Sequence, residues 1–570
     1  MLPSVIAAVI IEVAGGGWRA VRRSPFARHP PQTTNHTLAP ALPLHHNSPM
    51  LNGSPDIGSR TLWRVSLRLI PFLFFLYILA YLDRVNVSVA ELQMSAPLDR
   101  GGLGFDNAIV GFGMGVFFWG YWILEIPSTL SVVRWGARWV FVRVLILWGI
   151  CAALIGSIGT PFASTLFGWL PTISEHADAV TGIDGALQTV FGGLCQLFGS
   201  DGSVHAAAAS AHFINGLSHN AAYQFYFFRF MLGFFEGGFF PSVIFYLSMW
   251  FRGADRAKAI ATFMAAIPLS SMIGLPLSGL LLNVHWFDLP GWRWIFILEG
   301  IAPVLAGFAT IFLLPDRPEN APWLPHDERA WLLAELDREH EAKKNQGHGA
   351  WVHHLGMILA LTLVYFCLNV TSYGLSTFLP RILKKLTGLS EDRDASLLTA
   401  APYSLALIVM LINGWHSDRT SERPWHVAVP LTVLGLGIWL TAGAYSAGGV
   451  AAIILIGVVG PCMYAHLGAF WPIPTMYLGA TAAASAIGFI NMIGNLGGSV
   501  GPMMVGEVSK YHGSFAPALR LLAPWPLAAA AIIMLMRWLV RPAVQPAPVA
   551  ATAPAPLPQP QAAIIQVSRP

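Results

Sequence analysis

The sequence predicts an all-α membrane protein with twelve transmembrane helices, arranged as two pseudosymmetric bundles of six. Hydrophobic residues make up 55% of its 570 residues and charged residues only 11%, whereas a soluble protein carries about 25% charged residues. The mean hydropathy is +0.58. Apolar stretches of roughly 20 residues, the length that crosses a bilayer core as a helix, recur from Leu67 to Val540.

Twelve such stretches are expected to be membrane spans, and a charged segment divides them. The expected spans are 67–90, 107–131, 139–158, 224–249, 258–282, 293–314, 354–378, 395–415, 427–445, 449–470, 480–505 and 519–539. The longest charged stretch, from Pro315 to Gly349, separates the sixth span from the seventh. Six helices on either side of a polar linker is the layout of a carrier built from two repeated halves.

The spans define the expected domain boundaries. The segments are an N-terminal extension (1–60), a first bundle (61–315) with a long outer loop (159–222), a cytoplasmic linker (316–352), a second bundle (353–541) and a tail (542–570). The extension lacks periodicity and the tail is rich in Ala and Pro, so both are expected to be disordered. Translation starting at Met50 instead of Met1 would remove residues 1–49, and the sequence leaves this choice open.

The orientation follows from Lys and Arg, which are retained in short loops on the cytoplasmic side. Basic residues flank the first, second, fourth and eighth spans: Arg60, Arg64, Arg68, Arg134, Arg138, Arg252, Arg256, Lys258, Arg419 and Arg423. Both termini are therefore expected in the cytoplasm, and the loop at 159–222, which has no Lys or Arg, outside. One loop on the expected outer side contradicts this pattern, because it holds Arg381, Lys384, Lys385 and Arg393.

Two clusters of ionisable residues lie inside the expected spans, where such groups persist mainly by facing a cavity or pairing with each other. Asp83 and Arg84 lie in the first span, and Arg229 and Glu236 lie two helical turns apart in the fourth. Each cluster combines a guanidinium, which can hold a carboxylate through two parallel hydrogen bonds, with a carboxyl that can carry a proton. Such a site can bind an anion and a proton together. The alternative is a pair of internal ion pairs that only lock helices together.

Six segments carry a resemblance to a known family. They are Leu-Ala-Tyr-Leu-Asp-Arg-Val-Asn (79–86), Glu-Ile-Pro-Ser (125–128), Arg-Trp-Gly-Ala-Arg (134–138), residues 229–241, residues 292–300 and Asn-Met-Ile-Gly-Asn-Leu-Gly-Gly (491–498). In these motifs the chain resembles the anion:cation symporter family of the major facilitator superfamily, from about Thr61 to Arg541. The resemblance implies a multi-pass carrier of the bacterial cytoplasmic (inner) membrane that imports carboxylates, such as aromatic, hydroxy or sugar acids, by alternating access.

The resemblance also implies roles for individual residues. Asp83 and Glu236 match the proton-carrying acids of relatives that take up sugar acids. Arg84 and Arg229 match arginines that hold the substrate carboxylate or tune those acids. Three further residues resemble cavity-lining positions, and a fourth is placed by its helix alone: Tyr81, Trp471 and Asn491, with Tyr121 as the fourth.

A latch at the cytoplasmic side is the expected gate. In the superfamily an acidic residue, an arginine and a glycine form it between the second and third helices, and here Val133 stands at the acidic position. The latch is therefore expected to be weakened, or to use Glu125 or a carboxylate of another helix. The expected gating residues are Arg134, Gly136, Arg138, Asp418 and Arg419. Anchoring at the cytoplasmic face is the alternative explanation for Arg134 and Arg138. Glu125 and Glu299 are explained first by a structural role as hydrogen-bonding partners.

The sequence thus predicts a monomeric, proton-coupled importer with an organic anion, protons and membrane lipid as its partners. No cofactor or metal is expected, since the four cysteines form no binding motif, and no nucleic acid, since no basic binding face is present. An antiporter of organic anions or sugar phosphates without net proton flux is the first alternative. A membrane sensor and a membrane-embedded enzyme are weaker ones, because neither a sensory domain nor a catalytic motif is found. Which carboxylate is carried, whether sodium replaces protons, and what the loop at 159–222 does stay open.

Overall fold

The computed structural model describes residues 57–160, 162–163, 220–345, 355–477 and 480–539. Every regular element in these ranges is a helix, as the composition predicts. Residues 1–56 of the expected N-terminal extension, most of the loop at 159–222 and the tail lie outside the described residues, while residues 57–60 of the extension are helical and not disordered as predicted.

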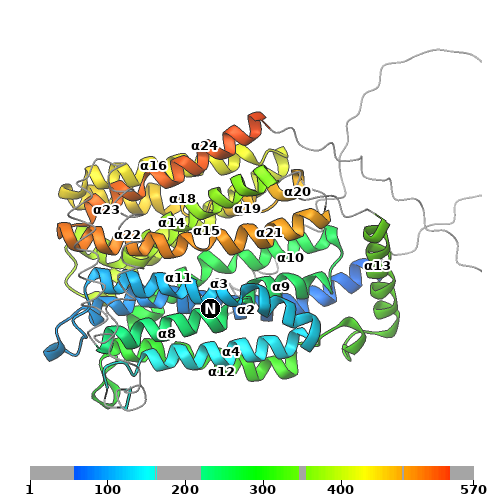
Figure 1. Cartoon of the computed structure of the whole chain (residues 1–570), viewed down its shortest axis with the longest axis horizontal. Helices are drawn as coiled ribbons and strands as arrows, with labels where there is room; N and C mark the ends of the chain where they lie inside the picture. Colours follow the sequence, from blue (N-terminus) through cyan, green and yellow to red (C-terminus); the bar gives the residue numbers. More distant parts are fainter. Residues whose placement is uncertain (1–56, 161, 164–219, 346–354, 478–479, 540–570) are drawn as a thin grey trace, which may run out of the picture.

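The helices fall into a first group, a linker helix and a second group (Figure 1). The first group is α2 (Ile57–Met94), α3 (Asn107–Trp135), α4 (Ala137–Ile155), α8 (Asn220–Glu236), α9 (Phe239–Ser248), α10 (Gly253–Met264), α11 (Ala266–Leu281) and α12 (Gly291–Leu313). The linker helix is α13 (His326–Asn345). The second group is α14 (Leu355–Thr387), α15 (Asp392–Thr420), α16 (Pro424–Gly443), α17 (Gly449–Ile454), the π-helical turn Leu455–Val459, α18 (Gly460–Cys462), α19 (Leu467–Phe470), α20 (Ile473–Tyr477), α21 (Ala480–Gly494), α22 (Gly497–His512), α23 (Phe515–Leu522) and α24 (Pro524–Leu539).

Eleven helical stretches among the described residues are long and apolar enough to cross a membrane, where twelve were predicted. The span predicted at 480–505 is the one that is not among the eleven. It forms α21 and α22, which are interrupted at Asn495 and Leu496. The first span is also longer than predicted, because α2 begins at Ile57 and runs for 38 residues.

The two groups of helices lie side by side, the first group in the lower part of Figure 1 and the second in the upper part. They meet where α3 packs on α22, α11 on α15 and α2 on α14. The contact between α3 and α22 is a contact of backbones. A Cβ atom added at Gly111 would lie 2.4 Å from the carbonyl oxygen of Pro502, and one at Gly506 would lie 2.4 Å from that of Asn107. Small residues let membrane helices approach this closely.

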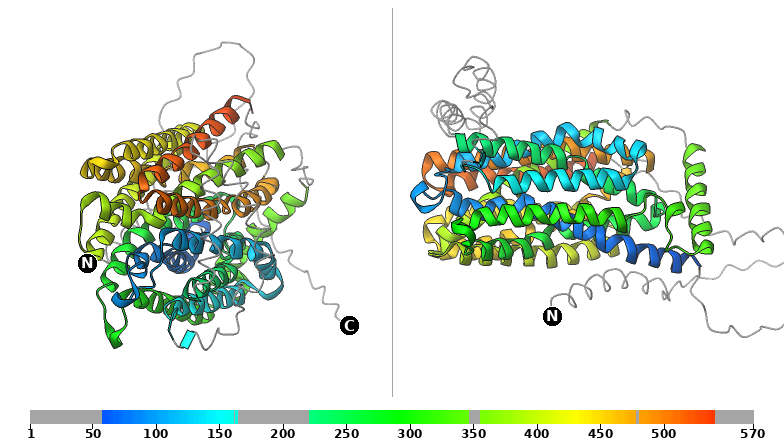
Figure 2. Two further views of the ribbon diagram at one scale, coloured as in Figure 1. Left: turned by 60° about the vertical axis from the view of Figure 1, so that its left-hand side comes forward. Right: turned by 90° about the horizontal axis from the view of Figure 1, so that it is seen from below.

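The linker is not merely a charged loop, because α13 stands across one end of the bundle (Figures 1 and 2). Its Glu328 is buried and meets two basic residues of α2, with Arg60 Nε 2.9 Å and Arg64 Nε 3.0 Å from its carboxylate. These ion pairs explain why α2 extends beyond its predicted apolar span. The domain boundaries around this linker remain predictions.

A break between α8 and α9 sets the position of Glu236, the last residue of α8. Gly238 follows with φ of 84°, a left-handed conformation that favours glycine. A Cβ atom there would lie 2.4 Å from Cβ of Ser128 on α3. The glycine therefore lets the end of α8 approach α3 closely.

Candidate functional site

The two predicted charged clusters meet in the interior of the bundle, but they do not pair as the sequence suggested. Arg84 of α2 binds Glu236 of α8, with Nε 2.9 Å and Nη2 2.5 Å from the same carboxylate oxygen, Oε1. Both residues are buried. Neighbouring residues on a helix point about 100° apart, so Asp83 and Arg84 cannot both face the same partner. The ion pair therefore joins the two clusters, across two helices.

Arg84 is enclosed by aromatic side chains as well. Its Nη1 donates to the hydroxyl of Tyr373 at 3.1 Å, and Tyr373 belongs to α14 of the second group. The guanidinium carbon lies 5.2 Å from the ring centre of Tyr81, 5.4 Å from that of Phe117 and 5.1 Å from that of Tyr121. Aromatic faces attract a cation at such distances. One side chain of the first group thus contacts both halves of the protein.

Asp83 faces a different environment from Arg84. Its carboxylate accepts hydrogen bonds from Asn86 Nδ2 at 3.2 Å and from the indole nitrogen of Trp148. It is fully buried, and no arginine or lysine of the described residues forms a salt bridge with it. A buried carboxyl without a cationic partner is costly to keep charged.

Arg229 is also buried without a carboxylate partner in the described part of the chain. Its Nη1 donates to the backbone carbonyl of Asp83 at 3.3 Å, and its Nε donates to that of Gly113 at 3.4 Å. Its guanidinium carbon lies 4.9 Å from the ring centre of Phe117, which is also near Arg84. Two guanidinium groups therefore flank one aromatic ring, and only one of them has a carboxylate counter-ion.

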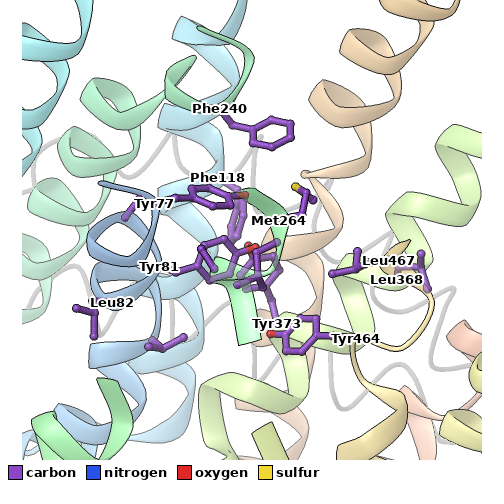
Figure 3. Packing of buried hydrophobic residues seen from close by; sticks show 14 of the residues in the cluster. Tyr77, Tyr81, Leu82, Phe118, Phe240, Met264, Leu368, Tyr373, Tyr464 and Leu467 are labelled. Carbon is purple, nitrogen blue, oxygen red and sulfur yellow. The ribbon is translucent and has the colours of Figure 1, made fainter. Parts of the chain in front are cut away.

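A small cavity lies beside this cluster, between the two halves. Its volume is about 20 Å³, room for roughly one water molecule. It is lined by Tyr81, Ile267, Tyr365, Leu368, Asn369, Ser372, Tyr373, Tyr464, His466 and Leu467. Figure 3 shows how Tyr81 and Tyr373 approach each other within the surrounding aromatic core. Sites for small molecules usually measure about 300 Å³ or more, so the halves must separate before an organic molecule can enter.

The remaining predicted binding residues lie in three places. Tyr121 is buried beside Arg84. Asn491 instead donates to Glu125 at 2.5 Å, and this buried contact joins α21 to α3. Trp471 packs on Tyr365, with ring centres 5.0 Å apart, and not on the charged cluster.

Three residues of the cluster were not predicted, namely Phe117, Trp148 and Tyr373. They lie inside expected spans, where hydropathy does not distinguish an aromatic residue from its apolar neighbours. The run Thr371-Ser372-Tyr373 is a polar interruption of the seventh span, and this was the available signal for Tyr373. Nothing in the local sequence distinguishes Trp148.

A carboxylate from outside α3 and α4 lies beside two of the predicted latch residues. Asp316, just after α12, accepts a hydrogen bond from the backbone nitrogen of Arg138 at 2.8 Å. A Cβ atom at Gly136, where φ is 84°, would lie 2.7 Å from the same carboxylate. Arg138 Nε also donates to the carbonyl of Leu314 at 2.7 Å, while Arg134 is exposed. Asp316 is thus the carboxylate that contacts this segment, whereas Glu125 accepts a hydrogen bond from Asn491, and the gating role of Arg134, Gly136 and Arg138 remains a prediction.

In the second half, the expected gating residues do not pair with each other. Asp418 binds Arg423 at 2.6 Å. Arg419 lies over the ring of Trp415, 5.5 Å from its centre. The gating role of both residues remains a prediction.

The Major Facilitator Superfamily model matches residues 164–502 of this chain. The chain belongs to the major facilitator superfamily. A protein of Agrobacterium vitis named "Putative tartrate transporter" is 36% identical over 471 residues, which are 82% of this chain and 92% of that protein. The inner membrane transport protein RhmT of Escherichia coli is 31% identical over 82% of this chain and 94% of its own length. The resemblance seen in the motifs is confirmed.

Solved transporters of the superfamily share the fold. A bacterial homologue of the human lysosomal transporter Spinster, in an inward-facing and occupied conformation, superposes with a TM-score of 0.56 at 15% identity and covers 85% of this chain and 98% of its own. A D-xylose–proton symporter superposes with a TM-score of 0.54 at 16% identity, over 84% of this chain and 97% of its own. The family model and the relatives make this major facilitator protein a multi-pass membrane transporter and not an enzyme, and the solved structures show its fold.

Proposed function

We propose that this transporter imports a small organic anion together with protons. The anion and the protons bind at one site, which is formed by Asp83, Arg84, Arg229 and Glu236. The relatives support the substrate class, since two of them are named for tartrate, a hydroxy acid with two carboxylates. The observation that carries the proposal is the ion pair between Arg84 and Glu236, which contacts the second half through Tyr373.

The charges of the site couple the anion to protons. When Asp83 and Glu236 are both ionised, their charges offset those of the two arginines, so a bound carboxylate then adds one uncompensated negative charge. An uncompensated charge buried away from water is strongly unfavourable. A proton on Glu236 or Asp83 restores neutrality. In this mechanism one proton accompanies each carboxylate, and a dicarboxylate brings two.

Protonation also frees the binding surface. Glu236 occupies the Nε and Nη2 edge of Arg84, which is an edge that a substrate carboxylate binds through two hydrogen bonds. When Glu236 takes a proton, its hold on the guanidinium weakens and the substrate can replace it. Arg229, which has no carboxylate partner among the described residues, is the second anchor. Loss of the proton on the cytoplasmic side returns Glu236 to Arg84 and expels the anion.

Uptake of labelled L-tartrate into proteoliposomes with an imposed pH gradient tests the proposal. The unmodified protein should accumulate tartrate, and an uncoupler should abolish the accumulation. Glu236→Gln should lose gradient-driven accumulation but keep exchange of internal for external tartrate, because the fold and the arginines remain. Glu299→Gln is the matched control, since this buried carboxyl binds Ser278 at 2.7 Å and not an arginine. Accumulation by Glu236→Gln equal to that of the control would refute proton coupling at this residue, and insensitivity to the uncoupler would favour an antiporter.

A further inference from the structure

Contacts between the two halves close the end of the bundle opposite α13. Arg381, near the end of α14, reaches across to the first half. Its Nη1 donates to Asn107 Oδ1 at 2.5 Å, its Nη2 donates to the backbone carbonyl of Glu91 at 2.9 Å, and it forms a salt bridge with the Glu91 carboxylate. The Glu91 side chain is fully buried, whereas the Arg381 side chain is 22% exposed. Water therefore reaches this ion pair from one side only.

A second set of contacts lies beside the first. Lys510 of α22 forms a salt bridge with Asp106, and the Asp106 side chain also caps α3 by accepting from the backbone nitrogen of Ile109 at 2.9 Å. Asn107 Nδ2 donates to Ser509 Oγ at 2.9 Å. Together with the backbone contact of α3 and α22, these bonds leave the halves in direct contact at this end.

The contacts of Arg381 lie on the helices that carry the central site. Glu91 follows Arg84 by seven residues on α2, and Arg381 follows Tyr373 by eight residues on α14. At 1.5 Å per residue, each pair is separated by about 10 to 12 Å along its helix. Any separation of α2 from α14 at this end must break the Glu91 contact before it opens a path to Arg84.

At the other end of the bundle, α13 binds the first half. Arg252 Nη1 lies 3.4 Å from Glu335, and Arg256 Nη2 lies 3.1 Å from Glu339. These ion pairs fix the linker helix and do not join the two halves. Asn491 and Glu125 form a hydrogen bond between the halves elsewhere, but among the described residues the salt bridges that join the two halves, Arg381 with Glu91 and Lys510 with Asp106, both lie at the Arg381 end.

We propose that Arg381, with Glu91 and Asn107, is the outer gate of the transport cycle, a positioning residue that keeps the central site closed to the outside until substrate enters. This inference rests on the proposed import function and on the orientation predicted from the basic loops. It also accounts for the loop that contradicted that orientation. The charge of Arg381 is neutralised by Glu91 of the other half, and that of Lys384 by Asp392 at 2.5 Å. These basic residues form ion pairs at the outer face and do not mark a cytoplasmic loop.

The test uses a cysteine at Ser372, which lines the small central cavity. A membrane-impermeant maleimide is added to right-side-out and to inside-out vesicles, and the labelling rate is measured without any substrate. The protein lacking the added cysteine gives the background of the native thiols. Because no substrate is needed, the result is independent of whether tartrate is carried.

In Arg381→Glu, the cysteine at position 372 should be labelled from the outside about tenfold faster than in the parent. The loss of a buried ion pair is large enough to change an equilibrium by at least this factor. Labelling from the inside should fall, because the outward-open state gains population at the expense of the inward-open one. Combining Arg381→Glu with Glu91→Arg should restore both rates to within about twofold, because the ion pair is re-formed with its ends exchanged. Arg393→Glu is the matched control, as Arg393 pairs with its neighbour Asp394 at the same end of the bundle.

A purely structural brace predicts a different pattern, with labelling raised from both sides or with loss of the folded protein. Equal outside rates for Arg381→Glu and Arg393→Glu would overturn the proposal, as would a failure of the exchanged pair to restore the parent rates. Where Arg381→Glu does not elute as a single folded species, Glu91→Gln replaces it. That variant removes one charge with little change in volume and should still raise labelling from the outside, and an unchanged rate would likewise overturn the gate.

Discussion

The ion pair between Arg84 and Glu236 gives the sharpest prediction about the interior, because both charges are removed from water and each is the main counter-ion of the other. Arg84 is 7% exposed and Glu236 0% exposed, and two hydrogen bonds of 2.9 and 2.5 Å join them. Removing one partner of such a pair typically costs about 3–5 kcal/mol, because the other charge is left buried. Removing both partners usually costs little.

The surroundings of Arg84 reduce the expected loss of stability. After Glu236→Gln, the guanidinium of Arg84 keeps its hydrogen bond to Tyr373 and its contacts with the aromatic faces around it. Each aromatic contact is worth about 0.5–2 kcal/mol to a cation. We therefore expect a loss of about 2–4 kcal/mol in the free energy of unfolding for Glu236→Gln. For Arg84→Gln, the loss in the free energy of unfolding should be no larger than this. The remaining carboxyl of Glu236 can take up a proton and become neutral, whereas an arginine without its partner stays charged.

The assay is reversible unfolding in mixed micelles, applied to both single variants and to the double variant Arg84→Gln, Glu236→Gln. The double variant should lie within about 1 kcal/mol of the more stable single variant, which makes the coupling energy about 1–5 kcal/mol. Glu299→Gln combined with Arg84→Gln is the control and should be additive. Additive losses for Arg84 and Glu236 would refute the ion pair as a coupled unit.

Three further predictions concern the surroundings of the site. Gly238→Ala should destabilise the protein by about 1–3 kcal/mol, since φ is positive there. Gly443→Ala is the control and should not destabilise it, because nothing lies within 4 Å of the new Cβ atom. Thermal unfolding compares the two variants, and equal melting temperatures would refute the role of the break between α8 and α9. Asp316→Ala should cost about 1 kcal/mol through the lost bond at the start of α4, with exposed Glu319→Ala as its control in the same measurement. Asn491→Ala should cost about 1–3 kcal/mol, because it leaves Glu125 buried without its amide donor, and an unchanged stability would show that this contact contributes nothing.

The sequence identified the charged residues of the site because charge is conspicuous within apolar spans. Asp83, Arg84, Arg229 and Glu236 are all buried and all within one small region. Their pairing was not predictable, since it depends on how α2 and α8 face each other. The spacing within α8 suggested that Arg229 accompanies Glu236, but packing places Arg84 at Glu236 and leaves Arg229 against backbone carbonyls.

The fold was predictable at the level of spans, and less so where helices break. Hydropathy located the spans, because length and apolar content are local properties of the chain. It missed the interruption of the eleventh span near Asn495, where the residues remain apolar and glycine-rich. Contacts between distant segments were invisible as well: Tyr373 with Arg84, Asp316 with Gly136, and Arg381 with Glu91.

The central claim is that the site stays electrically neutral when the anion binds, so that protons and carboxylates move together. The most direct measurement is proton movement during L-tartrate entry into proteoliposomes, followed with a pH-sensitive dye in the lumen and labelled tartrate in parallel. Neutrality of the buried site predicts about two protons per tartrate dianion and no net current. Tartrate entry without acidification of the lumen would contradict the account.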